Sequence, residues 1–145
     1  MKLPFQPTIL APCTAVGRTL LFRIAPEGDV AAALEKLRDG ITTECGVIGI
    51  GEPAILALGK RIEGLRTFPA MSGAAVSIPS TQEALCFLLR GADRGVVFDL
   101  TQEIREFLSD AFVLVDSNDT FVYRSNRDLT RFEDGTENPK DDDAI

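Results

Sequence analysis

The order of the apolar segments constrains the fold of this chain more than any other feature. A run that favours a β-strand is followed by a segment with helical spacing and then by another β-favouring run, and this pattern occurs twice. The predicted order is therefore strand, helix, strand, strand, helix, strand. That order is typical of the split βαβ, or ferredoxin-like, arrangement. We predict an α+β fold with an antiparallel sheet and its helices on one face.

The first copy of the pattern is well marked by its boundaries. Residues 15–24 (AVGRTLLFRI) are apolar and β-compatible and lie between two prolines. A helix is predicted next, because Asp29 can cap its first turn and Gly40 can end it. Its apolar residues recur at helical spacing: Val30, Leu34, Leu37 and Ile41. A short buried strand is predicted at residues 47–50.

The connection between the two copies is long. A short helix is predicted at residues 53–59, because a proline suits the first turn of a helix. Residues 60–81 are expected to be irregular, since they hold two prolines and two glycines. Connections of this length inside a compact domain are often functional.

The second copy begins with a predicted strand at residues 84–90. Apolar residues then mark one face of a predicted helix over about 92–110. The last part is predicted to be a hairpin, with strands at 112–115 and 120–124. The intervening letters DSND supply residues that favour turns.

Composition narrows the class of protein and its partners. A chain of 145 residues with 45% apolar residues suits one compact domain with a real core. A net charge of -7 argues against nucleic acid and anionic membranes as partners, because both reward clustered lysine and arginine. The N-terminal letters MKLPFQPTILAPC make a poor secretion signal, and no apolar run is long enough to span a membrane. We expect a cytoplasmic protein; packaging inside a protein shell is left open.

Cysteine and histidine usage limits the chemistry. Cys13, Cys45 and Cys86 are far apart and odd in number, which fits neither a disulfide framework nor a metal site. Buried free thiols are expected at the two cysteines near apolar runs. The chain has no histidine, so it lacks the commonest general base near neutral pH and the commonest haem-iron ligand.

Residues 131–139, RFEDGTENP, hold the candidate site. Gly135 permits backbone angles closed to other residues, and Pro139 pushes Asn138 toward an extended conformation. Asp134 is then the available acid or base. The spacing alone also fits an ordinary hairpin turn, because Asp-Gly favours type I′. A calcium loop fits poorly, since the nearby acids lack the one-three-five spacing.

Residues 127–139, RDLTRFEDGTENP, resemble the signature of the dye-decolourising peroxidases, a family of haem peroxidases. That signature runs Gly-x-x-Asp-Gly and is often extended as GF-x-DGT-x-NP. Further similar segments are FQPTILAP near the start, LRTFPAM at 65–71 and IPSTQEALCFLLRG at 78–91. The resemblance therefore covers essentially the whole chain.

The resemblance implies a fold of two ferredoxin-like units, of which this chain is the N-terminal half. Residues 1–126 would form the first unit of a dimeric α+β barrel-type fold. Residues 127–145 would form the distal haem-pocket loop and the start of the link to the second unit. The family's iron-binding histidine lies in that second unit, so the expected partner is the C-terminal half of the same protein or a companion fragment.

The resemblance also implies a function. Haem b would be the cofactor, with hydrogen peroxide as oxidant and dyes, phenols or similar donors as reductants. Asp134 would be the catalytic acid and base. The haem-binding residues would be Phe132, Glu133, Asp134, Gly135 and Thr136, with no metal ligand in this chain. A homo-oligomer is expected.

One residue departs from the family signature. Arg131 stands where the signature opens with glycine, and its side chain can change how the loop turns or add a cation near Asp134. Two alternatives to a peroxidase stay open. One is a non-catalytic ferredoxin-like association module, and the other is a haem-binding, iron-releasing protein of the same family.

Overall fold

The structure is a computed structural model that describes residues 5–41, 46–133 and 135–139. Its main sheet has four antiparallel strands in the order β2-β5-β1-β6, which is the ferredoxin-like order. The predicted α+β class is confirmed. The strands are β1 (Val16–Ile24), β2 (Gly46–Ile50), β5 (Leu85–Gly91) and β6 (Phe112–Phe121). The remaining elements are η1 (Pro7–Ile9), α1 (Val30–Gly40), α2 (Glu52–Ala57), α3 (Arg94–Leu108), β3 (Met71–Ser72) and β4 (Ser77–Ile78).

Both long helices begin at an aspartate that caps the first turn. The Asp29 side chain accepts a hydrogen bond from the backbone N–H of Ala32 at 3.0 Å, as the sequence predicted. The Asp93 side chain accepts from Gly95 and Val96 at 2.7 and 3.1 Å. The second helix therefore starts two residues later than predicted, because Asp93 holds the non-helical cap position.

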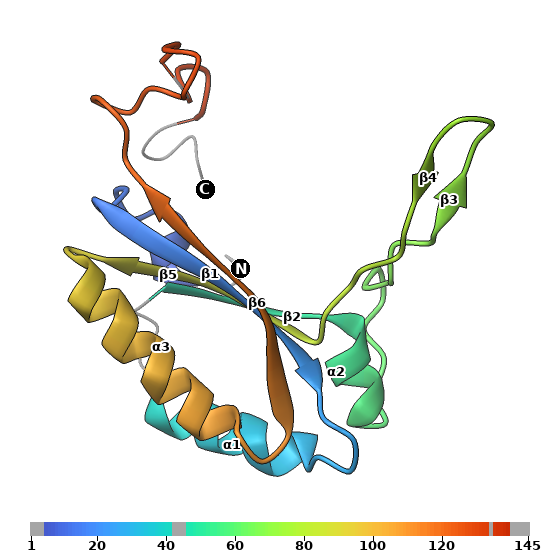
Figure 1. Cartoon of the computed structure of the whole chain (residues 1–145). Coiled ribbons are helices and arrows are strands. Elements are labelled where there is room, and N and C mark those ends of the chain that lie inside the picture. Colours follow the sequence, from blue (N-terminus) through green and yellow to red (C-terminus); the bar gives the residue numbers. More distant parts are fainter. Residues whose placement is uncertain (1–4, 42–45, 134, 140–145) are drawn as a thin grey trace.

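The core lies between the helices and one face of the sheet. Figure 1 shows α1 and α3 side by side on that face. The rings of Phe22 and Phe87 meet edge to face, with centroids 5.6 Å apart. The other large, fully buried side chains are Leu20, Leu85, Ile104 and Leu108. Burial of these apolar side chains is the main force that fixes the helices to the sheet.

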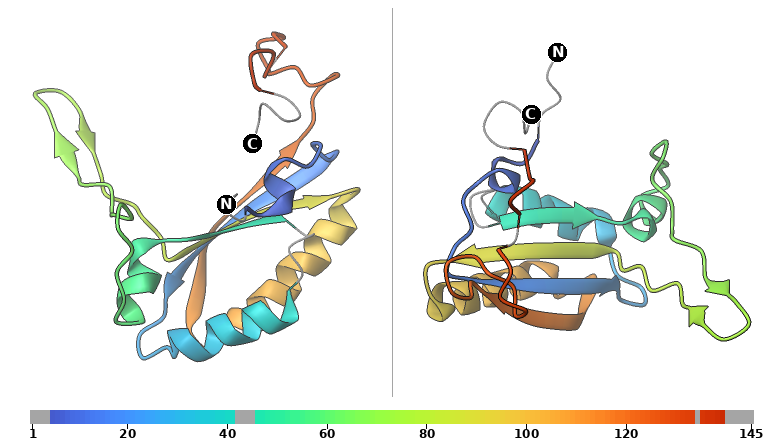
Figure 2. Two further views of the ribbon diagram at one scale, coloured as in Figure 1. Left: turned by 180° about the vertical axis from the view of Figure 1, so that it is seen from behind. Right: turned by 90° about the horizontal axis from the view of Figure 1, so that it is seen from above.

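The opposite face of the sheet carries apolar side chains without a helix to cover them, in the part of the chain that the structure describes. Leu21 and Cys86 pair across β1 and β5 on this face, and Thr19 pairs with Leu88. Leu88 is 42% exposed. We call this surface the open face. Figures 1 and 2 show that two segments project beyond it at opposite ends of the sheet: the β3–β4 arm and the loop after β6.

The end of the sheet differs from the prediction. The expected hairpin of 112–115 and 120–124 does not form, because β6 is one strand that pairs with β1 along its length. The polar letters DSND lie in its middle, where Asp119 forms an ion pair with Arg18 at 2.6 Å. A β6 residue is inserted opposite the step from Leu21 to Phe22, which is a bulge. Polar residues suit this strand because it is a sheet edge exposed to water.

The long connection between α2 and β5 forms an arm. Within the stretch predicted to be irregular, β3 and β4 pair as a small antiparallel hairpin. The backbone N–H of Thr67 donates to the Glu52 carboxylate at 2.6 Å and ties the base of the arm to α2. The exposed apolar side chains of the arm are Ile62, Phe68, Met71, Val76 and Ile78. A two-stranded hairpin of this size is marginally stable in water, so the arm is suited to contact another surface.

The other sheet edge, at β2, is blocked by side chains from the N-terminal segment. The Gln6 amide both donates to the Ile48 carbonyl at 2.7 Å and accepts from the Ile48 N–H at 2.8 Å. The buried Thr8 hydroxyl donates to the Gly46 carbonyl at 2.6 Å. These bonds use backbone groups that an edge strand otherwise offers to a foreign strand.

Within the described residues, none of the helices combines the length and the apolar character that crossing a bilayer requires. Cys86 is partly buried, and this burial raises the pKa of its thiol. Cys13 is exposed, and both thiols are free. Cys45 lies outside the described residues.

Candidate functional site

The candidate loop begins where β6 ends at Phe121. The chain rises from one end of the sheet and folds back on itself (Figure 1, orange to red). Its reversal uses three consecutive residues with positive φ: Arg124 at 37°, Ser125 at 57° and Asn126 at 64°. The N–H of Arg127 donates to the Tyr123 carbonyl at 2.9 Å and closes this turn. Non-glycine residues rarely adopt such angles, so other contacts must hold them.

Residues 127–133 form a closed loop on top of this turn, which we call the Asp128 loop. Its two ends meet in an antiparallel bridge between Arg127 and Glu133. The N–H of Asp128 donates to the Phe132 carbonyl, and the N–H of Arg131 donates to the Asp128 carbonyl, each at 3.0 Å. The Arg127 guanidinium donates to the Arg131 carbonyl at 2.8 Å. The loop is therefore ordered by its own main chain and by one arginine.

The Asp128 carboxylate is the side chain that organises the inside of this loop. Its Oδ1 accepts a hydrogen bond from the Thr130 hydroxyl at 2.6 Å and from the Phe132 N–H at 3.2 Å. These bonds favour the charged form of the carboxylate. They hold the pKa of Asp128 below its usual range, with the Thr130 hydroxyl as the largest cause and the backbone N–H groups as further ones.

Arg131 adopts a φ of 77°, in the left-handed region that favours glycine. This is the position where the resembling signature has glycine. The backbone thus takes a conformation that glycine reaches without strain, although an arginine stands there. The hydrogen bonds on both sides of Arg131 hold it in this conformation.

The second part of the site contains a further turn. Gly135 has a φ of 73°, and its carbonyl accepts from the Asn138 N–H at 3.2 Å. A Cβ at Gly135 would lie 2.9 Å from Asn138 Nδ2, so the position favours glycine on two grounds. This turn is centred on Thr136 and Glu137. Asp134 is both the predicted acid or base and part of the Asp-Gly pair of the hairpin-turn alternative, and it lies outside the described residues.

The predicted haem-binding residues of this loop are largely exposed. Phe132 is 75% exposed and its neighbour Leu129 is 77% exposed. Glu133 and Thr136 are exposed as well, and Gly135 is half-buried. Large apolar side chains that are exposed on a hydrogen-bonded loop indicate a contact surface for another apolar group.

A shallow groove lies on the sheet below this loop. Its volume is about 260 Å³, and it is lined in part by Cys13, Gly17, Leu88, Arg90 and Phe121. The Arg90 guanidinium is held by the Ala11 carbonyl at 2.9 Å. Small-molecule sites commonly reach roughly 300–1,000 Å³. The groove is therefore one wall of a larger site and not a complete pocket.

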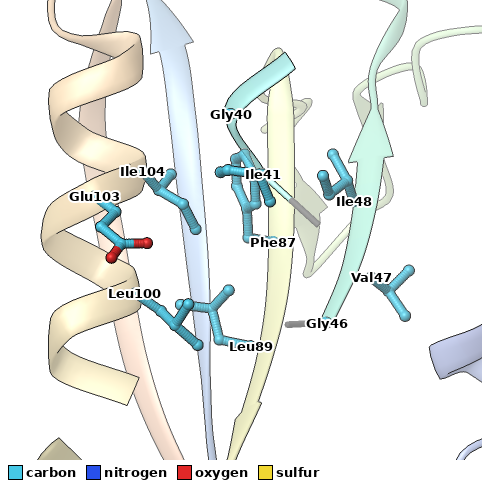
Figure 3. A pocket seen from close by; sticks show the side chains of 10 residues that line it. All are labelled: Gly40, Ile41, Gly46, Val47, Ile48, Phe87, Leu89, Leu100, Glu103 and Ile104. Carbon is cyan, nitrogen blue, oxygen red and sulfur yellow. The ribbon is translucent and has the colours of Figure 1, made fainter. Parts of the chain in front are cut away.

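A second hollow lies in the core and is separate from the loop. It has a volume of about 200 Å³ and lies between α3, the end of α1 and the strands β2 and β5. Figure 3 shows that its lining is apolar apart from the carboxylate of Glu103. Its walls include Ile41 and Gly46, the residues on either side of 42–45, which lie outside the described residues.

Sequence reasoning missed the role of Asp128 and Thr130. A signal was present, because an aspartate followed two residues later by a threonine is typical of a local side-chain-bonded turn. Among the described residues, no cluster of three or more His, Cys, Asp or Glu side chains could hold a metal ion.

Comparison with known proteins places these features in context. A scan against models of protein families found no match. The chain is 33% identical to a dye-decolorizing peroxidase of Mycobacterium tuberculosis, over 94% of its own length and 45% of that protein. It is similar to a DypB variant of Rhodococcus jostii RHA1 in complex with heme, with a TM-score of 0.77 and 30% identity. That match covers 94% of this chain and 49% of the DypB chain.

A third relative is the encapsulated DyP-type peroxidase from Mycobacterium smegmatis. The TM-score is 0.70 at 29% identity, and the match covers 92% of this chain and 48% of that one. The chain thus spans about half the length of the relatives it matches, and an N-terminal half fits this share.

Proposed function

Because this chain belongs to the dye-decolourising peroxidase family and spans about half the length of its relatives, we propose that it forms the distal part of a haem b peroxidase. The observation that carries the proposal is the hydrogen-bonded loop at 127–133, with the turn at 135–138. This part of the sequence holds the residues of the family signature, and it presents the exposed apolar side chains of Leu129 and Phe132. A relative in complex with heme supports the choice of cofactor.

The described residues fit one side of a flat apolar group. Phe132 and Leu129 offer exposed apolar surface, and Gly135 lets a neighbouring group approach the main chain closely. Phe132, Glu133, Gly135 and Thr136, together with Asp134, would contact the edge and face of the haem. The chain contains no histidine, so an imidazole that binds the haem iron would come from a companion half.

Bound haem supplies the redox chemistry by which peroxide oxidises a dye or a phenol. The role of this chain would be to supply the group that accepts and returns a proton. The Asp134 carboxylate would accept a proton from hydrogen peroxide and return it to the oxygen that leaves as water. A carboxylate with a reference pKa of about 3.9 remains a base under mildly acidic conditions, where a histidine is protonated. We therefore expect activity to favour mildly acidic pH.

The companion half would pack on the open face. That face carries exposed Leu88 and Val113, and it is bounded at its ends by the arm and by the candidate loop. Residues 1–126 would then be the first ferredoxin-like unit of a two-unit barrel. Residues 127–145 would be the haem-pocket loop and the beginning of the link. The relatives contain about as much chain again, enough for such a second unit.

We further propose that the protein is a cytoplasmic homo-oligomer. We also propose that this oligomer is enclosed in a protein shell. The encapsulated relative supports the shell. The exposed apolar side chains of the arm support association, because surfaces of this kind mark contact sites. They equally suit the alternative of a non-catalytic association module.

The test is to produce this chain together with the remaining half of its polypeptide and to add haem. We expect a Soret band and peroxide-dependent oxidation of a phenol. Asp134→Asn should lower turnover by roughly 100-fold or more while the Soret band stays, because general acid–base catalysis contributes about that much. Asp99→Asn, on the exposed side of α3, is the matched control.

Three results would count against the proposal. Stable association of the halves without haem uptake would favour the association module. Haem uptake with Asp134→Asn turnover equal to the parent would remove the proposed role of that carboxylate. Loss of iron from haem in place of phenol oxidation would favour the iron-releasing alternative.

A further inference from the structure

Asp128 lies six positions before the proposed catalytic Asp134 and bonds to several parts of the loop between them. We propose that Asp128 is a positioning residue: it sets the path of the chain from Arg131 to Glu133, the described residues that precede the proposed catalytic Asp134. This inference rests on the proposed function for its catalytic consequence. Its structural part concerns described residues alone.

The contacts of Asp128 reach every turn of the loop. Its carbonyl accepts from the Arg131 N–H, and its N–H donates to the Phe132 carbonyl. Its Oδ1 accepts from the Thr130 hydroxyl at 2.6 Å and from the Phe132 N–H at 3.2 Å. The main-chain bonds survive any substitution, but the Oδ1 bonds do not. The carboxylate oxygen is thus the part of the network that depends on side-chain identity.

This oxygen matters because Arg131 needs support. A φ of 77° is disfavoured for arginine, and without restraint the backbone would relax toward the common regions. The Oδ1 bond to Phe132 N–H lies on the peptide that follows Arg131, so it holds the chain on the far side of the strained residue. The Arg127 guanidinium holds the Arg131 carbonyl from outside the loop. Asp128 therefore supports the left-handed conformation of Arg131.

The geometry has a catalytic consequence. Misplacement of a reacting group by about 1 Å can lower a rate by roughly 100-fold. Glu133 is fixed through its bridge to Arg127, and this bridge stands at the end of the loop that Asp128 organises. Relaxation of Arg131 would shift the bridge and the chain beyond it. On the proposed function, we therefore expect a lower turnover with haem binding retained.

The experiment compares Asp128→Ala with Asp128→Asn in the haem-loaded protein that contains both halves. Asparagine keeps an Oδ1 acceptor, whereas alanine removes it. We expect Asp128→Ala to lower kcat by about 10- to 100-fold, with the Soret band and the KM for peroxide little changed. Asp128→Asn should recover most of kcat. Asp99→Ala, an exposed aspartate of α3, should leave kcat unchanged.

A second readout does not depend on activity. Trypsin cleavage after Arg131, followed by mass spectrometry, should become faster in Asp128→Ala and stay near the parental rate in Asp128→Asn. A double substitution tests directly whether Asp128 supports the conformation of Arg131. In an Arg131→Gly background, which has no trypsin site at residue 131, Asp128→Ala should have a smaller effect on kcat, because glycine adopts the left-handed conformation unaided.

The outcomes separate the two ideas. Positioning by Asp128 is overturned if Asp128→Ala matches the parent in kcat and cleavage while Asp134→Asn is inactive. It is also overturned if Asp128→Asn is as impaired as Asp128→Ala. If Asp134→Asn keeps full turnover, the proposed function fails, and faster cleavage in Asp128→Ala still supports the structural part.

Discussion

Within the Asp128 loop, Arg131 has a strained backbone conformation that hydrogen bonds from its neighbours hold in place. Its φ of 77° is natural for glycine and costly for a residue with a Cβ, by roughly 1–2 kcal/mol. The bonds from Asp128 and Arg127 hold it there. The loop therefore holds Arg131 in a strained backbone conformation. Such local strain is common at functional sites.

The first prediction concerns this strain. Arg131→Gly should raise the free energy of unfolding by up to about 1 kcal/mol, because the relief of strain exceeds the added chain entropy of glycine. Urea denaturation of the chain measures the change. Arg105→Gly, inside helix α3, is the matched control and should lower stability by about 1 kcal/mol. Equal losses at both positions would contradict strain at Arg131.

The second prediction is a pH dependence of the Asp128 loop. The pKa of Asp128 is lowered in the folded state, chiefly by the Thr130 hydroxyl. The stabilisation that depends on the negative charge of the carboxylate is thus fully present above its unfolded pKa of about 3.9 and lost as the pH falls through the folded pKa. The amide signal of Phe132, followed by NMR, should titrate below about pH 3.9, and this titration should vanish in Asp128→Asn. A midpoint above that value would contradict the bonding described.

At the level of helices and strands, stability comes from the face that the helices cover. Ile104 of α3 is 1% exposed in the core, whereas Phe98 of the same helix is 52% exposed. Buried residues such as Ile104 hold the helix on the sheet, and exposed residues such as Phe98 do not. The edge strands are held differently: β6 by an ion pair with β1, and β2 by the Gln6 and Thr8 side chains.

The third prediction tests that division of α3. Ile104→Ala should lower the free energy of unfolding by about 3 kcal/mol, since it removes buried methyl groups and leaves a cavity. Phe98→Ala should change it by less than about 0.5 kcal/mol, because the ring is already in water. Chemical denaturation of the two variants side by side gives the comparison. Similar losses would mean that Phe98 is covered by a surface outside this chain.

At the scale of the whole molecule, the two faces of the sheet have different roles: one is covered by helices, and the other is the open face. One face closes the core of this unit, and the other offers Leu88, Val113 and the groove below the loop. Residues 64–82 of the arm bear a single charged residue, Arg66. A sparsely charged projection of this kind is better suited to an apolar partner than to a charged one.

The fourth prediction is that the open face binds the companion half. Leu88→Asp should weaken association of the halves, because it places an unpaired charge in an apolar contact. Phe98→Asp, on the helix side, should leave association unchanged. Size-exclusion chromatography of the co-produced halves separates bound from free chain. Weakening by both variants alike would place the interface elsewhere.

The type and order of the secondary structure were determined by the sequence itself. Helical spacing, strand alternation and the Asp29 cap act within a few residues, so local patterns suffice to predict them. The residue types of the signature likewise identified the loop at 131–139. These predictions needed only residues that are close together in the sequence and no contact between distant segments.

Only the tertiary structure decided the course of β6 and the interior of the loop. The letters DSND favour a turn and an exposed edge strand equally well, and pairing with β1 and with Arg18 selects the strand. The positive φ of Arg131 and the bonds of Asp128 were not predictable, because arginine by itself disfavours that conformation. The physical reason is the same in both cases: contacts between separated parts of the chain overrule local preference.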